Sequence, residues 1–110
     1  MRAPGPVALL GACAALLLAV ATAVAAVPET QIVIKDFMFG PASVTVKAGT
    51  TVTWVNRDDE PHTIASDSGL YRSGALDTGG EFHFTFDKPG TYHYVCTIHP
   101  RMLGTIIVEP

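Results

Sequence analysis

The sequence contains few cysteines and no excess of basic residues. Seven Lys and Arg stand against ten Asp and Glu, so the formal net charge is −3. Proteins that bind nucleic acids present a basic face to the phosphates, and we therefore expect no nucleic-acid partner. The chain also lacks internal repeats and, after its N-terminal segment, any sustained helical periodicity. In a chain of 110 residues these absences favour a single non-helical domain.

The N-terminal segment differs in character from the rest of the chain. Arg2 precedes residues 7–27, which carry no charge and are rich in alanine. Small residues end this run in an A-x-A-like pattern, so we predict a secretory signal peptide over residues 1–26, cleaved near Ala25 or Ala26. The alternative is an uncleaved membrane anchor, because the apolar run is long enough to span a bilayer. A lipid-attachment signal at Cys13 is disfavoured, since the residues after it stay apolar.

Removal of this leader would leave Cys96 as the single cysteine of the mature chain. Cys13 is lost with the leader, and Cys96 has no partner with which to form an internal disulfide. An unpaired cysteine in an exported protein suggests a reactive thiol or a bound metal. Beyond Ala26, six Lys and Arg face ten Asp and Glu, a balance of −4. We expect export to the bacterial periplasm or, if the leader is retained, anchoring to the membrane with the domain facing the periplasm.

Residues 27–110 predict one all-β domain. Short segments alternate apolar and polar residues, as strands with one buried face do, and turn residues separate them. The predicted strands cover residues 31–37, 43–46, 51–56, 62–66, 81–86, 91–96 and 104–109. Short alternating strands at this spacing indicate a β-sandwich or barrel. Residues 67–78 are the least regular part of the domain.

The alternation within the strands also predicts which histidines are exposed. In the strand predicted at residues 91–96, Tyr94 and Cys96 share one face and His93 lies on the other. The aromatic face is expected to be the core, so Cys96 points inward at the end of the strand. His83 alternates with two phenylalanines and is expected to be exposed, like His93. Neither of these two histidines is therefore a candidate ligand.

The segment CTIHPRM, residues 96–102, contains a thiol, an imidazole and a thioether within seven residues. Cys and Met are common core residues and lone histidines often only form hydrogen bonds, so a purely structural role is the alternative to a metal site. His62 starts a predicted strand and can reach the same end of a sandwich. One thiolate, two imidazoles and one thioether are the donors of a blue-copper site, whereas zinc binds thioethers poorly. The candidate ligands of this copper ion are His62, Cys96, His99 and Met102.

Two segments, VTWVNRDDEPHTI at residues 52–64 and GTYHYVCTIHPRM at residues 90–102, resemble the cupredoxins, most closely the amicyanin and plastocyanin types. The Cys-x-x-His-x-x-Met spacing is similar to the short ligand loop of the amicyanin type, and the resemblance extends over residues 31–109. It implies a Greek-key β-sandwich of about eight strands that holds one type 1 copper cycling between Cu(II) and Cu(I). The ligands that it implies are His62, Cys96, His99 and Met102.

The resemblance also carries expectations for three other positions. Asn56 matches a family asparagine that braces the ligand loop and whose backbone N–H is expected to donate to the copper thiolate. Ile98 stands where amicyanin-type loops often have proline, so it retains an N–H that can donate a second hydrogen bond to the Cys96 sulfur. Arg101 replaces a residue that is often large and apolar in the family, within the patch where partners dock.

These expectations lead to a monomeric electron carrier that shuttles single electrons between redox partner proteins. The alternative is a periplasmic copper-binding or delivery protein, and a third hypothesis is a structural sandwich domain without metal. Delivery proteins usually offer exposed, exchangeable Met and His ligands, and the absence of a Met-rich or His-rich tract favours the carrier. Nothing in the sequence supplies a second copper or a catalytic triad, so we do not expect an enzyme. A membrane is expected to be a partner only if the leader is uncleaved.

Overall fold

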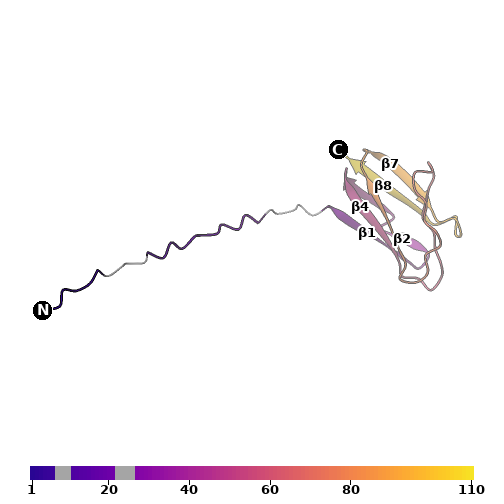
Figure 1. The fold of residues 1–110 in the computed structure, drawn as a ribbon. Helices are drawn as coiled ribbons and strands as arrows, with labels where there is room; N and C mark the ends of the chain where they lie inside the picture. The colour runs from indigo at the N-terminus through magenta and orange to yellow at the C-terminus, as the bar shows by residue number, and fades with distance from the viewer. Residues whose placement is uncertain (7–10, 22–26) are drawn as a thin grey trace.

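The computed structural model describes residues 1–6, 11–21 and 27–110, and the folded part lies in the last of these ranges (Figure 1). Residues 1–6 and 11–21 form neither helix nor strand. The expected cleavage of the leader near Ala26 falls outside the described residues. In the part of the chain that the structure describes, no helix is long and apolar enough to cross a membrane.

Within residues 27–110, eight strands form two four-stranded sheets, ordered β2-β1-β4-β6 and β3-β8-β7-β5. The strands are β1 (Glu29–Lys35), β2 (Met38–Gly40), β3 (Ser43–Lys47), β4 (Thr50–Asn56), β5 (Ala65–Ser66), β6 (Glu81–Phe86), β7 (Gly90–Val95) and β8 (Leu103–Glu109). Both sheets are mixed, because β1 runs parallel to β4 and β3 runs parallel to β8, whereas the other pairs are antiparallel. The all-β Greek-key sandwich predicted from the sequence is confirmed.

The core lies between the two sheets and explains the alternation of the strand sequences. In β1, Ile32 and Ile34 are fully buried while Val33 between them is only half-buried, as expected for a strand with one face toward the core. Trp54 of β4 is fully buried and meets Tyr94 of β7 edge-on, with ring centroids 5.4 Å apart. Aromatic pairs in this T-shaped arrangement add to the free energy gained by burial. The two sheets are therefore joined by an aromatic contact between β4 and β7.

A close approach between β7 and β8 fixes the start of β8. Tyr94 pairs with Gly104, and a Cβ at position 104 would lie 2.0 Å from Cζ of the tyrosine ring. The ring therefore occupies the space that any side chain at Gly104 would need. Tyr94 also packs edge-on against Phe39, with centroids 4.7 Å apart, and is 2% exposed. This packing anchors the strand that begins at Leu103, directly after the predicted ligand Met102.

The strand predicted at residues 62–66 is largely wrong. Only Ala65–Ser66 forms a strand, β5, which pairs with β7. His62 instead exchanges two backbone hydrogen bonds with Leu76, 3.1 Å and 2.8 Å long. The returning segment at residues 67–78 lies beside residues 62–65 and supplies the partners that a sheet neighbour would have supplied. His62 is therefore held in a bridge between two loops and not in a regular strand.

Candidate metal centre

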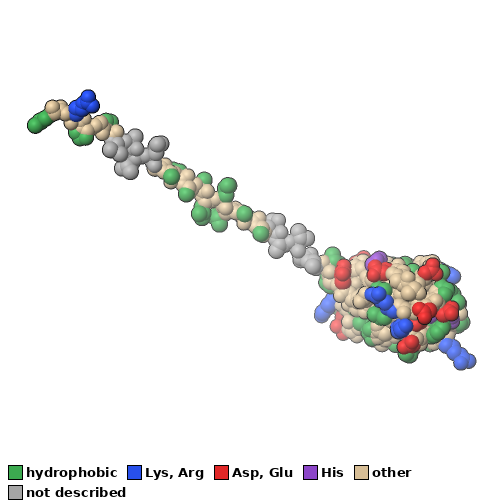
Figure 2. Space-filling view, turned by 90° about the horizontal axis from the view of Figure 1, so that it is seen from below, with side chains coloured by type: hydrophobic (Ala, Val, Ile, Leu, Met, Phe, Trp, Pro, Cys, Tyr) green, Lys and Arg blue, Asp and Glu red, His purple; other side chains and the backbone are tan. Residues whose placement is uncertain are grey.

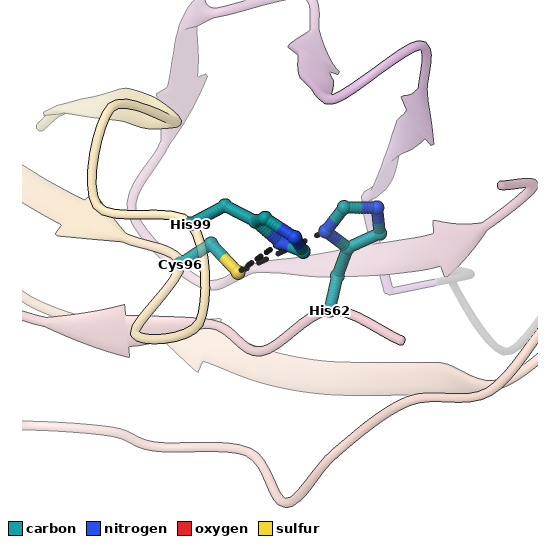
Figure 3. Close-up of side chains that lie close together, drawn as sticks. All are labelled: His62, Cys96 and His99. Carbon is teal, nitrogen blue, oxygen red and sulfur yellow. Dashed lines mark hydrogen bonds between the residues drawn. The ribbon is translucent and has the colours of Figure 1, made fainter. Parts of the chain in front are cut away.

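Loops at one end of the sandwich bring the candidate ligands together. Cys96 directly follows the last residue of β7, and His99 and Met102 lie in the loop that leads to β8. His62 belongs to the connection between β4 and β5, which passes from one sheet to the other. Figure 3 shows the side chains of His62, Cys96 and His99 converging from these separate segments.

Both imidazoles present their Nδ1 atom to the same sulfur. The Nδ1 atoms of His62 and His99 lie 3.8 Å and 3.7 Å from Sγ of Cys96, as the dashed lines of Figure 3 mark. The three ligand atoms all lie within 4.8 Å of one another. Cys96 and His62 are fully buried, and His99 is half-buried. One sulfur and two imidazole nitrogens that face a common space form a donor set that fits copper.

Met102 is tied to the other two loop residues through the backbone. Its N–H donates to the carbonyl of His99 at 2.9 Å, and its carbonyl accepts the N–H of Cys96 at 3.2 Å. These two bonds close the loop on itself and fix how Cys96, His99 and Met102 follow one another. The Met102 side chain is 4% exposed. The structure therefore places the candidate thioether in the buried part of the same loop.

The two remaining histidines lie on the outer faces of the sheets. His83 shares a hydrogen bond of 2.7 Å with Thr53 Oγ1, and His93 shares one of 3.1 Å with Thr105 Oγ1. Both histidines are exposed. The exposure of both histidines, which strand alternation predicted, is confirmed.

Hydrogen bonds to the sulfur favour the thiolate form of Cys96. The backbone N–H of Thr63 donates to Sγ at 3.4 Å, and its hydroxyl lies 3.7 Å away. Burial raises the pKa of the Cys96 thiol, but hydrogen bonds from the Thr63 backbone and from His99 outweigh burial, so the pKa lies below its ordinary value. The backbone of Ile98 lowers this pKa as well, as expected for a residue that is not proline. Since the thiolate is the form that binds metals, the site is prepared for a cation.

The role expected for Asn56 at the sulfur is wrong. Its backbone N–H donates to the carbonyl of Gly80 at 3.0 Å and is not available to Cys96. Its side-chain Nδ2 donates to the carbonyls of Glu60 and Leu76, both at 2.8 Å. Asn56 therefore braces the loop that carries the upstream histidine, and Thr63 provides the N–H that reaches the sulfur. The sequence offers one signal for Thr63, which is that it directly follows a candidate ligand.

A pair of threonines joins the two loops of the site. Oγ1 of Thr63 accepts the N–H of Thr97 at 2.8 Å and lies 2.8 Å from the Thr97 hydroxyl. Thr97 directly follows Cys96 in the chain, so this contact fixes the sulfur-bearing loop against the segment that begins at His62. It is a connection between residues far apart in the sequence, which strand alternation does not predict.

Asp58 is a second residue of the site that the sequence did not reveal. Its Oδ2 lies 2.8 Å from Nε2 of His62, and its side chain is 7% exposed. Burial raises the pKa of Asp58, but hydrogen bonds from the Phe37 N–H, from His62 and from the Asp36 N–H outweigh it, so the pKa lies below its ordinary value. An ionised carboxylate only accepts hydrogen bonds, so Nε2 of His62 carries the proton. Nδ1 is then left free to bind a metal.

Apolar side chains surround the half-buried His99 at the surface. A shallow hollow beside it is lined by Phe37, Ile98, Pro100 and Arg101. Phe37 and Ile98 are 48% and 47% exposed, so the hollow is largely apolar, with one cation at its edge. Over the face of the folded part shown in Figure 2, acidic and basic side chains are interspersed with apolar ones. The edge of the site is thus exposed at the surface, whereas its sulfur is buried.

Comparisons with known proteins agree with this geometry. The sequence profile of the cupredoxin-like domain family matches residues 7–108. The chain is 37% identical over 94 residues to the amicyanin of Paracoccus versutus, covering 79% of this chain and 71% of the relative. It is 44% identical over 85 residues to the plastocyanin of Scenedesmus fuscus, covering 66% and 87%. A purple cupredoxin from Nitrosopumilus maritimus has a similar fold, with a TM-score of 0.68 and 34% identity over 73% of this chain and 99% of that one.

Proposed function

The chain belongs to the cupredoxin-like family, and on this premise we propose that it is an exported electron carrier whose one type 1 copper is held by four side chains. These are His62, Cys96, His99 and Met102. The observation that carries the proposal is the approach of two Nδ1 atoms to within 3.8 Å and 3.7 Å of one buried sulfur with a lowered pKa. Bound copper supplies reversible one-electron chemistry between Cu(II) and Cu(I).

Hydrogen bonds within the protein orient the candidate ligands without a bound metal. The carboxylate of Asp58 fixes which nitrogen of His62 carries the proton, and the N–H of Thr63 holds the sulfur of Cys96. Because these partners are buried, the donors do not reorganise through water when the charge at the site changes. A site that keeps one arrangement in both oxidation states suits electron transfer. The proposed role is therefore to accept and pass on electrons, without a catalytic step.

The exposed edge supports a role in transfer between proteins. His99 is half-buried and lies beside apolar side chains, whereas the sulfur it faces is fully buried. Electrons would therefore enter and leave through the imidazole of His99, by docking of redox partner proteins at this edge. Arg101 places a positive charge there and favours partners with an acidic surface near their own redox centre. We further propose a monomer in the bacterial periplasm, released from a leader over residues 1–26 or anchored by it.

Copper delivery is the competing function. A delivery protein has to release its ion readily, which exposed ligands promote. The burial of Cys96 and His62 at 0% exposure and of Met102 at 4% favours retention. Slow exchange of bound copper with a chelator, combined with fast and reversible reduction, would support the carrier.

The test is the absorption and EPR spectrum of the copper-loaded protein and of single variants. Wild type is expected to show an intense band toward the red end of the visible and narrow copper hyperfine splitting. Cys96→Ser should lose the band, because it arises from charge transfer from the thiolate. Met102→Leu should keep a coloured site with a changed reduction potential, since the thioether is a weak axial ligand.

A matched control is His83→Ala, which removes an exposed histidine that hydrogen-bonds to Thr53 on the outer face of a sheet and should leave the spectrum unchanged. His99→Ala should disrupt the band, and added imidazole should restore part of it. An intense band that survives in Cys96→Ser would refute the proposal, as would its loss in His83→Ala.

A further inference from the structure

The turn between β1 and β2 has an unusual backbone. Asp36 and Phe37 are its two central residues, and both have positive φ angles, 52° and 57°. Two-residue hairpin turns of this kind favour Asn-Gly, because a side chain with a positive φ is crowded by its own backbone. A bulky aromatic residue at the second position is uncommon. Some other contact must hold Phe37 in this conformation.

The carboxylate of Asp58 provides that contact. Its Oδ1 accepts the N–H of Asp36 at 2.7 Å, and its Oδ2 accepts the N–H of Phe37 at 3.0 Å. Successive N–H groups in a turn that point the same way form a small concave site for an anion. The same Oδ2 atom also receives Nε2 of His62 at 2.8 Å. One buried carboxylate therefore binds the turn and a candidate metal ligand at the same time.

The ring of Phe37 lies against both imidazoles of the site. Its centroid is 5.5 Å from that of His62 and 4.9 Å from that of His99, with interplanar angles of 82° and 84°. These are edge-on contacts of the favourable kind. Phe37 is 48% exposed, so one side of the ring faces solvent while the other covers the histidines. The Phe37 ring thus covers part of both imidazoles and shields them from solvent.

We propose that Asp58 is a positioning residue that holds the His62 ring and the Asp36–Phe37 turn in one arrangement, so that the Phe37 ring covers the site and restrains His99. The inference rests on the proposed copper function, although the contacts that Asp58 and Phe37 make are contacts within the protein and do not involve a metal. Loss of the carboxylate removes the acceptor of three donors at once. The turn then relaxes toward a conformation without positive φ, and the phenyl ring leaves the histidines.

The first test uses the copper-free protein and does not depend on metal binding. In wild type, NMR should detect contacts between the Phe37 ring and both imidazoles, together with slow hydrogen exchange at the N–H groups of Asp36 and Phe37. Asp58→Asn should lose the ring contacts and speed exchange at both N–H groups by about tenfold or more, because an amide offers one acceptor oxygen to three donors. Asp59→Asn removes the same charge from the neighbouring exposed position and should resemble wild type.

The second test measures how fast a chelator removes Cu(I) from the loaded protein. Phe37→Gly removes the ring while a glycine tolerates the positive φ, so it should speed removal by about tenfold. Asp58→Asn should have a similar effect if it acts through the ring. The double variant should then be no faster than the faster single variant, because residues that act through one contact are not additive.

Three outcomes would overturn the proposal: ring contacts that persist in Asp58→Asn, rates whose effects multiply in the double variant, or an unchanged rate in Phe37→Gly. If Asp58→Asn does not fold, Phe37→Gly still decides, because the proposal requires faster removal of Cu(I) and a more mobile His99 ring in that variant. Failure to bind copper at all would contradict the proposed function, whereas the NMR experiment would still test the role of Asp58.

Discussion

Replacement of Thr63 by valine should weaken the fold by an amount that the structure allows us to estimate. The change keeps the shape of the side chain and removes only Oγ1. That atom accepts the N–H of Thr97 at 2.8 Å and lies 2.8 Å from the hydroxyl of the same residue. Thr63 is 8% exposed, so water cannot take the place of Oγ1 from that side. The N–H of Thr97 therefore loses its partner.

The expected size of the effect follows from this geometry. A buried donor left without a partner costs about 1–3 kcal/mol, and a typical hydrogen bond contributes about 0.5–1.5 kcal/mol net. Thr97 itself is exposed, so water can recover part of the loss. We therefore expect a destabilisation of about 1–2 kcal/mol for Thr63→Val. With a urea dependence of about 1 kcal/mol per molar for a small domain, the unfolding midpoint should fall by about 1–2 M.

The assay is urea unfolding of the copper-free protein, so that metal affinity does not contribute. Thr63→Ser keeps the oxygen and should recover most of the stability. Thr45→Val, on an exposed face of β3, is a matched control and should change stability by less than about 0.5 kcal/mol. A midpoint for Thr63→Val equal to that of wild type, or a loss in Thr63→Ser as large as in Thr63→Val, would show that Oγ1 does not stabilise the ligand loop.

Three further predictions concern other parts of the molecule. Ile98→Pro should lower the reduction potential of the copper-loaded protein relative to Ile98→Ala, because only proline removes the N–H that helps to stabilise negative charge on the Cys96 sulfur. Voltammetry of the two variants tests this, and equal potentials would contradict it. Gly104→Ala should destabilise the fold by about 1–3 kcal/mol in urea unfolding, because the new methyl group overlaps the buried ring of Tyr94; an unchanged midpoint would mean that the ring moves freely. Burial raises the pKa of Tyr94 to about 12, above the ordinary value of 10.0, so the neutral form is favoured by folding. Its contribution is fully present below pH 10.0 and is lost as the pH rises toward about 12; Tyr94→Phe should flatten the decline of the unfolding midpoint over this range.

The sequence predicted those features that depend on local pattern. Alternation in the strand predicted at residues 91–96 placed Tyr94 and Cys96 on the inner face and His93 on the outer face, and the burial of each residue agrees with that alternation. The spacing of Cys96, His99 and Met102 suggested one loop, which the backbone bonds between them close. These relations extend over a few residues, so the geometry of a strand and the length of a loop determine them.

The features that the sequence did not predict depend on contacts between distant segments. Asp58 carries no recognisable motif, and its importance arises because the β1–β2 turn and His62 both reach its carboxylate. Thr63 was overlooked in favour of Asn56, because the resemblance pointed to an asparagine and only the structure shows whose N–H faces the sulfur. The supposed strand at residues 62–66 failed for the same reason, since its backbone partners come from residues 67–78.

The closure of the ligand loop on itself has a consequence for how such a protein can diverge. Cys96 and His99 each bond through the backbone to Met102, so the two bonds that close the loop do not involve the side chains of Ile98, Pro100 and Arg101. All three of these side chains lie at the surface. Substitutions there can alter the exposed face of the loop while the buried donors stay in place. Natural selection can therefore change the surface of this loop in single steps, each of which leaves the two closing backbone bonds in place.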